Sequence, residues 1–169
     1  MRSDRKTKKQ HSPPPPRWPV YRHVIFDCDS TLTGIEGIDE LASHSDTRQR
    51  VADLTRSAMD GKVNLETVYG ERLEILQPTR GAVRALRSRY RKHVVEDAAA
   101  LMQALQVLGH EVYIVSGGLF DPVREFGMHL GVAPEHIRAV EVEYDTLSGN
   151  WWQGQGPWHE AYLAVQHSV

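Results

Sequence analysis

Two short runs of apolar residues interrupt a sequence in which polar and apolar positions are otherwise mixed. The first is Val24–Phe26 and the second is Val112–Val115. A short, continuous apolar run is typical of a strand buried on both faces of a parallel sheet. Because segments with helical periodicity separate and follow these runs, the order of elements predicts an α/β domain with a parallel sheet.

Apolar residues recur at helical spacing in five segments. Helices are predicted near Val51–Ala58, Leu65–Leu76, Val83–Tyr90, Leu101–Leu108 and Asp121–Leu130. In the fourth segment Leu101, Ala104, Leu105 and Leu108 form one apolar stripe, the pattern of a helix face that packs on a core. Gly109 follows at the C-terminal cap position, where a glycine commonly ends a helix.

Toward the C-terminus the pattern changes from helical spacing to alternation. Ala139–Tyr144 alternates apolar and acidic residues, which predicts a strand. Turn-forming residues follow at 147–150. Trp151–Gln153 is therefore interpreted as the returning arm of a hairpin.

These elements divide the chain into three parts. Residues 1–19 are basic and proline-rich, with four consecutive prolines at Pro13–Pro16, and this composition predicts a disordered tail. The helical block at 35–78 is long for one crossover, so we interpret it as a cap inserted just after the first strand. Residues 20–34 and 79–169 then form the core.

Composition narrows the classes of function. The 169 residues suit one domain with a small cap, and their net charge of -2 gives no general attraction to nucleic acid or to an anionic membrane. No apolar run reaches the ~18 residues of a membrane span, and no early apolar stretch resembles a secretory signal. Cys28 is the single cysteine, which excludes an internal disulfide and favours a reducing, cytoplasmic setting.

The first candidate group of reactive residues follows the first strand, because ligands of open α/β sheets bind beyond the carboxyl ends of the strands. Asp27 and Asp29 lie there one residue apart, and two close carboxylates repel each other. Mg²⁺ relieves this repulsion if it takes a carboxylate oxygen of Asp27 and the backbone carbonyl of Asp29. Asp27 is then the candidate nucleophile toward phosphorus, and Asp29 the candidate general acid and base. A turn rich in Asp and Ser, with capping roles alone, is the structural alternative.

The second candidate group follows the second strand. The hydroxyl of Ser116 and the unhindered backbone N–H groups of Gly117 and Gly118 can hold the oxygens of a transferring phosphoryl group. Alone, Ser-Gly-Gly is usually a turn. Its place after an apolar strand, in a chain that also carries Asp27 and Asp29, favours a phosphate clamp.

The segment Asp27-Cys28-Asp29-Ser30-Thr31 matches the D-x-D-x-T motif of the haloacid dehalogenase superfamily. Glu36–Ala42 and Ala58–Val63 closely resemble segments of phosphoserine phosphatases, and Ser116–Gly118 matches a second motif of that family. The resemblance covers about residues 22–150. It implies a Rossmann-like parallel sheet with a helical cap, hydrolysis of O-phosphoserine through an aspartyl-phosphate on Asp27, Mg²⁺ as cofactor, and a role in serine biosynthesis.

The resemblance also implies roles for two residues of the cap. A glutamate at Glu36 and an arginine at Arg72 would bind the amino-acid part of phosphoserine. The charges fit, since a carboxylate suits an ammonium group and a guanidinium forks onto a carboxylate. Two solvated helix charges are the alternative interpretation.

Two motifs of the family are missing from this sequence. They are a lysine beside the phosphate and a Gly-Asp-x-x-x-Asp segment that supplies acidic Mg²⁺ ligands, and no lysine follows Lys92. We therefore expect the C-terminal part of the core to be absent, the first strand to lie at an open edge, and activity to be low. Two other functions stay open: a non-catalytic module that binds phosphate or an amino acid, and a related phosphatase or phosphotransferase for another small phosphomonoester.

Overall fold

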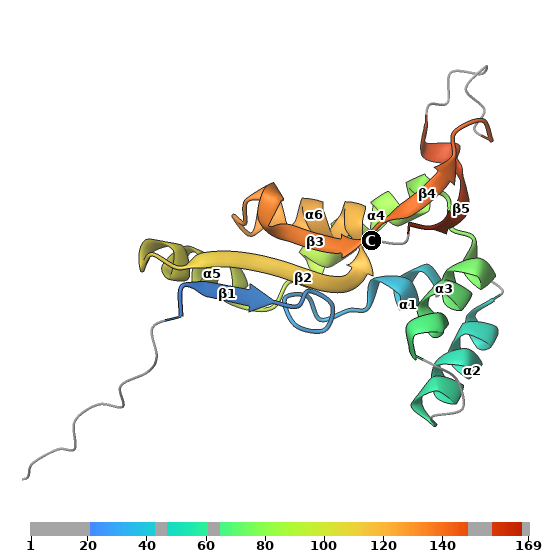
Figure 1. The fold of residues 1–169 in the computed structure, drawn as a ribbon, viewed down its shortest axis with the longest axis horizontal. Helices are drawn as coiled ribbons and strands as arrows, with labels where there is room; N and C mark the ends of the chain where they lie inside the picture. Colours follow the sequence, from blue (N-terminus) through green and yellow to red (C-terminus); the bar gives the residue numbers. More distant parts are fainter. Residues whose placement is uncertain (1–20, 43–46, 61–64, 149–156, 167–169) are drawn as a thin grey trace, which may run out of the picture.

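The computed structural model describes residues 21–42, 47–60, 65–148 and 157–166. Within these residues, three parallel strands form one sheet in the order β1-β2-β3, which leaves β1 at an edge (Figure 1). The strands are β1 His23–Phe26, β2 Glu111–Leu119 and β3 Ile137–Val140. The parallel sheet and the edge position of the first strand are therefore as the sequence predicts.

Six α-helices connect the strands in the described part of the chain. They are α1 Gly37–Ala42, α2 Arg48–Met59, α3 Leu65–Leu76, α4 Arg80–Lys92, α5 Ala98–Val107 and α6 Phe120–His129, with short 3-10 turns at η1 Pro134–His136 and η3 Pro157–His159. The first three lie beyond the end of the sheet to which β1 points, while α4, α5 and α6 lie along the sheet (Figure 1). The helices α1, α2 and α3 thus lie within the segment 35–78, and its separation from the core as a cap stays a prediction. None of the described helices is long and apolar enough to cross a membrane.

The core forms where α4, α5 and α6 pack on one face of the sheet. Its buried side chains include Tyr90, Met102, Val112, Ile114 and Phe126. On the opposite face Ile25 of β1 is 64% exposed and Val115 of β2 is 51% exposed. The prediction that Val24–Phe26 is buried on both faces is therefore wrong, because successive side chains of a strand point to opposite faces and these three helices share one of them.

The helix at α5 exists as predicted, but its buried face differs from the predicted stripe. Ala98 and Met102 are buried, whereas Leu101 and Leu108 are exposed. Spacing alone could not choose between the two apolar sides of a helix that is apolar nearly all round. Gly109 takes a positive φ of 88°, which confirms its role in ending the helix.

The strand predicted at Ala139–Tyr144 is two strands. β3 ends at Val140, and β4 Val142–Asp145 belongs to a separate two-stranded sheet, in which it pairs antiparallel with β5 Ala161–Val165. The alternating pattern did not reveal the break, because both strands have one partly buried face. The arm predicted at Trp151–Gln153 and the tail at residues 1–19 lie outside the described residues.

The β4–β5 hairpin is tied to the neighbouring helices. The hydroxyl of Tyr162 on β5 donates to Glu74 of α3 at 3.1 Å, and Arg80 of α4 pairs with the buried Glu160 at 2.8 Å. Tyr162 also joins a second buried cluster with side chains of α1, α3 and α4. The hairpin therefore fixes α3 relative to α4.

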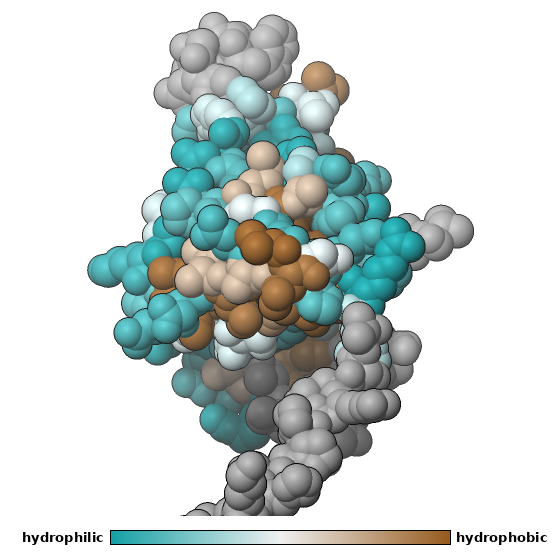
Figure 2. All heavy atoms as spheres, turned by 90° about the vertical axis from the view of Figure 1, so that its left-hand side faces the viewer, coloured by the Kyte–Doolittle hydropathy of each residue, from teal (hydrophilic) through white to brown (hydrophobic). Residues whose placement is uncertain are grey.

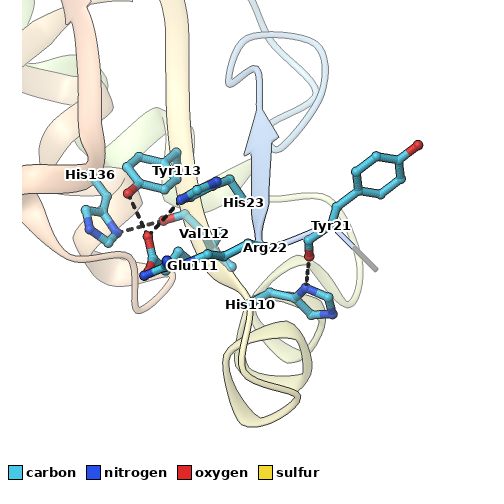
Figure 3. A network of polar contacts seen from close by, with 8 residues as sticks. All are labelled: Tyr21, Arg22, His23, His110, Glu111, Val112, Tyr113 and His136. Carbon is cyan, nitrogen blue, oxygen red and sulfur yellow. Dashed lines mark hydrogen bonds and ion pairs between the residues drawn. The ribbon is translucent and has the colours of Figure 1, made fainter. Parts of the chain in front are cut away.

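A polar network fixes β1 to β2 at their amino ends (Figure 3). Arg22 pairs with Glu111 at 2.7 Å, and the backbone N–H of Glu111 donates to the Arg22 carbonyl at 2.9 Å. The ring of Tyr113 lies between those of His23 and His136, at centroid distances of 5.8 Å and 4.1 Å. These contacts accompany the parallel pairing of the two strands, in which His23 lies opposite Glu111 and Phe26 opposite Ile114.

The amino end of the sheet also carries exposed apolar side chains. Val107 and Leu108 at the end of α5 and Met128 near the end of α6 are exposed. Figure 2 faces this end and shows a group of hydrophobic residues near its centre. The residues predicted to carry chemistry lie at the opposite end, where β1 and β2 finish.

Replacing Phe126 with alanine should destabilise the fold. Its side chain is fully buried and meets the Tyr90 ring edge-on at 5.6 Å, so the substitution leaves a cavity between α4 and α6. We expect the free energy of unfolding to fall by about 3–5 kcal/mol. Urea denaturation measures this change, with Met128→Ala on the exposed side of α6 as the matched control. Equal effects of the two substitutions would contradict the assignment of the core.

Candidate active site

The residues predicted from the two strand ends meet in one cavity. It has a volume of about 190 Å³. Its lining consists of Asp27, Asp29, Glu36, Ile38, Tyr69, Arg72, Ser116, Gly117 and Gly118. All six predicted site residues are among them, although they come from the β1 loop, α3 and β2. A second hollow of about 250 Å³ contains Arg80, Asp121 and Tyr144 and none of the predicted site residues.

A tight loop after β1 places the two aspartates. The carbonyl of Cys28 accepts backbone N–H groups from Thr31, Leu32 and Thr33 at 3.2, 2.8 and 3.2 Å. This arrangement turns the chain sharply, so Asp27 stays exposed at the cavity while the Asp29 side chain points inward and is only 9% exposed. The loop therefore gives the two carboxylates different surroundings.

Asp29 is the most buried carboxylate of the site, whereas Asp27 and Glu36 are exposed. The backbone N–H of Gly37 donates to its Oδ2 at 2.8 Å, while Oδ1 is buried without a partner among the described residues. Burial raises the pKa of Asp29, and the charges of Glu36 and Asp27 add to this effect. The Gly37 hydrogen bond lowers the pKa, as does the hydroxyl of Tyr90, which lies beside the carboxylate without the geometry of a full hydrogen bond. The net rise favours the protonated form, as a proton donor requires.

Residue 37 must be a glycine, because its backbone lies close to the side chains of Tyr90 and Asp29. A Cβ built on this residue would lie 2.2 Å from the Tyr90 hydroxyl oxygen and 3.4 Å from Asp29 Oδ2. Any side chain would therefore push α1 away from the carboxylate that its N–H now contacts. Neither Gly37 nor Tyr90 was singled out from the sequence as a site residue. Tyr90 had only the signature of an apolar helix position.

Ser116, Gly117 and Gly118 lie within β2, which continues to Leu119, instead of following the strand as predicted. The pairing with β3 is irregular between Val115 and Leu119. The Ser116 hydroxyl accepts the Gly118 N–H at 3.0 Å. A Cβ on Gly118 would lie 3.0 Å from Asp29 Oδ1, so this glycine lets the buried carboxylate approach the strand.

Glu36 and Arg72 both line the cavity, but they do not pair with each other. The hydroxyl of Ser30 donates to Glu36 Oε1 at 2.6 Å. Arg72 pairs instead with Asp39 of α1, a contact that the sequence did not indicate. Solvated helix charges are therefore the wrong interpretation for Arg72, whose side chain is only 14% exposed.

Cys28 is buried between the two aspartates. Burial raises the pKa of its thiol, and the charges of Asp29 and Asp27 raise it further. The thiol thus keeps its proton, and a protonated thiol is a poor nucleophile.

Metal donors are few in the described part of the chain. No group of three or more His, Cys, Asp and Glu residues there is arranged to hold a metal ion. Asp27 and Asp29 remain the candidate donors. Their oxygens have the hard character that Mg²⁺ prefers.

Comparison with known proteins identifies the family. The haloacid dehalogenase-like hydrolase family matches residues 24–166. This chain belongs to that family. The match confirms the predicted fold class, a parallel sheet with helices.

Individual relatives are phosphoserine phosphatases. The human enzyme is 32% identical over 121 residues, which are 72% of this chain and 54% of the human protein. That of Archaeoglobus fulgidus is 33% identical over 129 residues, which are 76% of this chain and 37% of the archaeal protein. The chain spans about half the length of the curated vertebrate relatives it matches.

Solved structures agree with the sequence relatives. One, described as a phospho-aspartyl intermediate analogue of phosphoserine phosphatase, has a TM-score of 0.67 and 25% identity, and the match covers 86% of this chain and 62% of that chain. A phosphoserine phosphohydrolase-like protein from Francisella tularensis has a TM-score of 0.65 and 26% identity, with 75% and 61% covered.

Replacing Asp29 with asparagine should stabilise the fold at neutral pH. The pKa of Asp29 is raised above its ordinary value of 3.8 in the folded chain. Protonated Asp29 therefore contributes stability to the fold that is fully present below pH 3.8 and is lost as the pH rises through the folded pKa. Asparagine stays neutral throughout, and we expect the melting temperature to rise by a few degrees at pH 7. The gain should shrink as the pH approaches 3.8.

Thermal unfolding followed by circular dichroism in the presence of a chelator measures this effect. Asp53→Asn, at an exposed acid of α2, is the control. A gain that does not depend on pH would contradict the burial of a charged carboxylate at Asp29.

Proposed function

We propose that this chain carries the site of a phosphomonoester hydrolase that acts on O-phosphoserine. The observation that carries the proposal is the single cavity lined by Asp27, Asp29, Ser116, Arg72 and Glu36. A cavity of about 190 Å³ suits a small molecule and not a polymer. The relatives named phosphoserine phosphatases support this choice of substrate.

In the first step, a carboxylate oxygen of Asp27 attacks the phosphorus atom. A bond forms between this oxygen and phosphorus, the bond from phosphorus to the serine oxygen breaks, and Asp29 gives its proton to the departing oxygen. Serine leaves and an aspartyl-phosphate remains. The exposed carboxylate of Asp27 and the raised pKa of Asp29 support these two roles.

In the second step, water attacks the aspartyl-phosphate. Asp29, now ionised, takes a proton from the water molecule. The water oxygen bonds to phosphorus, and the bond from phosphorus to Asp27 breaks. Phosphate leaves, and both aspartates return to their starting states. One residue thus serves as acid and then as base.

Binding groups surround this reaction centre. The Ser116 hydroxyl and the Gly117 N–H hold phosphoryl oxygens. Glu36 faces the ammonium group of phosphoserine, and Arg72 its carboxylate. The lining position of all four residues supports these roles.

Mg²⁺ is the cofactor that we propose for this site. Asp27, Asp29 and Glu36 place three acids against one cavity in which Arg72 is the only basic lining residue that the structure describes, and this charge favours a cation. Asp27 would hold the ion through its carboxylate and Asp29 through its backbone carbonyl. When bound, Mg²⁺ supplies positive charge that offsets the charge of the phosphate. The reaction would belong to serine biosynthesis in the cytoplasm, where a free Cys28 is stable.

Replacing Asp27 with asparagine tests the proposed function. The amide cannot form the acyl phosphate, so we expect release of phosphate from O-phosphoserine to fall at least about 1,000-fold. The assay measures inorganic phosphate with Mg²⁺ present, and Asp53→Asn should leave the rate unchanged. If the purified chain releases phosphate no faster than Asp27→Asn, catalysis by this chain is refuted.

A further inference from the structure

Arg72 uses only part of its hydrogen-bonding capacity. Its Nη2 donates to a carboxylate oxygen of Asp39, while its Nε is buried and has no partner among the described residues. These two nitrogens lie on the same edge of the planar guanidinium and form the fork that grips a carboxylate with two parallel hydrogen bonds. One donor of the fork is thus engaged, and the other is unsatisfied.

The two partners of this ion pair have unequal surroundings. The Arg72 side chain is 14% exposed and lines the cavity, whereas that of Asp39 is 59% exposed and does not line it. A mostly buried guanidinium needs a nearby negative charge. Asp39 supplies that charge from outside the cavity, so Arg72 stays beside the cavity without filling it.

Asp39 belongs to a short segment that also contacts the catalytic loop. At its start, Glu36 accepts from Ser30 at 2.6 Å, and the Gly37 N–H donates to Asp29 at 2.8 Å. Asp39 follows on the first turn of α1 and reaches across to α3. The position of Arg72 is therefore linked to the position of Asp29 through about one helical turn.

We infer that Asp39 is a positioning residue, which holds Arg72 so that the cavity accepts phosphomonoesters that bear a carboxylate. Without Asp39, Arg72 still shares the cavity lining with three acids, Asp27, Asp29 and Glu36. Attraction to them would draw the guanidinium across the space that a substrate carboxylate needs. This inference rests on the proposed function and deepens it, because it names what sets the selectivity for the amino-acid part.

Two ligands that differ by one carboxylate test the inference. O-phosphoserine carries this group, and O-phosphoethanolamine lacks it. Calorimetry on the Asp27→Asn protein with Mg²⁺ measures binding without turnover. Adding Asp39→Ala should raise the dissociation constant for O-phosphoserine about 10-fold, the scale of one charge-assisted hydrogen bond, and leave that for O-phosphoethanolamine unchanged.

Matched variants separate positioning from a general loss of structure. Asp53→Ala removes an acid of similar exposure, 55%, from α2 and should change neither dissociation constant. Asp39→Asn keeps an acceptor for Arg72 and should give an intermediate effect; it also provides the test if Asp39→Ala does not fold. On an Arg72→Ala background, Asp39→Ala should have no further effect, because the residue acts through Arg72.

Three results would overturn the inference. They are equal weakening of both ligands, no weakening of O-phosphoserine, and an undiminished effect of Asp39→Ala in the absence of Arg72. Any of these, with O-phosphoserine still bound by the Asp27→Asn protein, leaves the proposed function standing. If the Asp27→Asn protein binds neither ligand, the proposed function fails and the inference fails with it.

Discussion

The hydrogen bond from the Gly37 N–H to Asp29 is the contact on which the geometry of the site depends. It spans 2.8 Å and joins the loop after β1 to the start of α1. It exists only because residue 37 has no side chain, since a Cβ would lie 2.2 Å from the Tyr90 hydroxyl oxygen. The same approach brings Glu36 against Ser30 and Asp39 against Arg72. One close backbone contact thus sets both the reacting carboxylate and the residues proposed to bind the substrate.

Charge is the second constraint on the site. Burial raises the pKa of Asp29, a cost to folding that becomes useful if the residue donates a proton. Asp27 lies two residues away but is exposed, so similar carboxylates suit different roles. Arg72 balances part of this acidity, yet it is held from outside by Asp39. A cavity with three acids and one arginine favours a ligand that carries both positive and negative charge. A metal-bound phosphate with an amino-acid group is such a ligand.

Much of the fold could be predicted from the sequence, because the strongest signals are local. The apolar runs gave β1 and β2, and the order of elements gave a parallel sheet. The predictions that Val24–Phe26 is buried on both faces and that Leu101 and Leu108 lie on the packed face of α5 were wrong. Both features depend on which helices cover which face of the sheet. For the site, the motif residues Asp27, Asp29 and Ser116 meet as expected. The Asp39–Arg72 pair could not be found, because it joins helices whose relative position no local pattern specifies.

The proposed reaction depends on covalent phosphorylation of Asp27. Its most direct test is mass spectrometry of the peptide that contains Asp27, after incubation of the purified chain with O-phosphoserine and Mg²⁺ and a rapid acid quench. We predict one added phosphoryl group on Asp27 in the chain without substitutions and none in Asp27→Asn. Release of phosphate without any phosphoryl group on this peptide, or with the group on another residue, would contradict it.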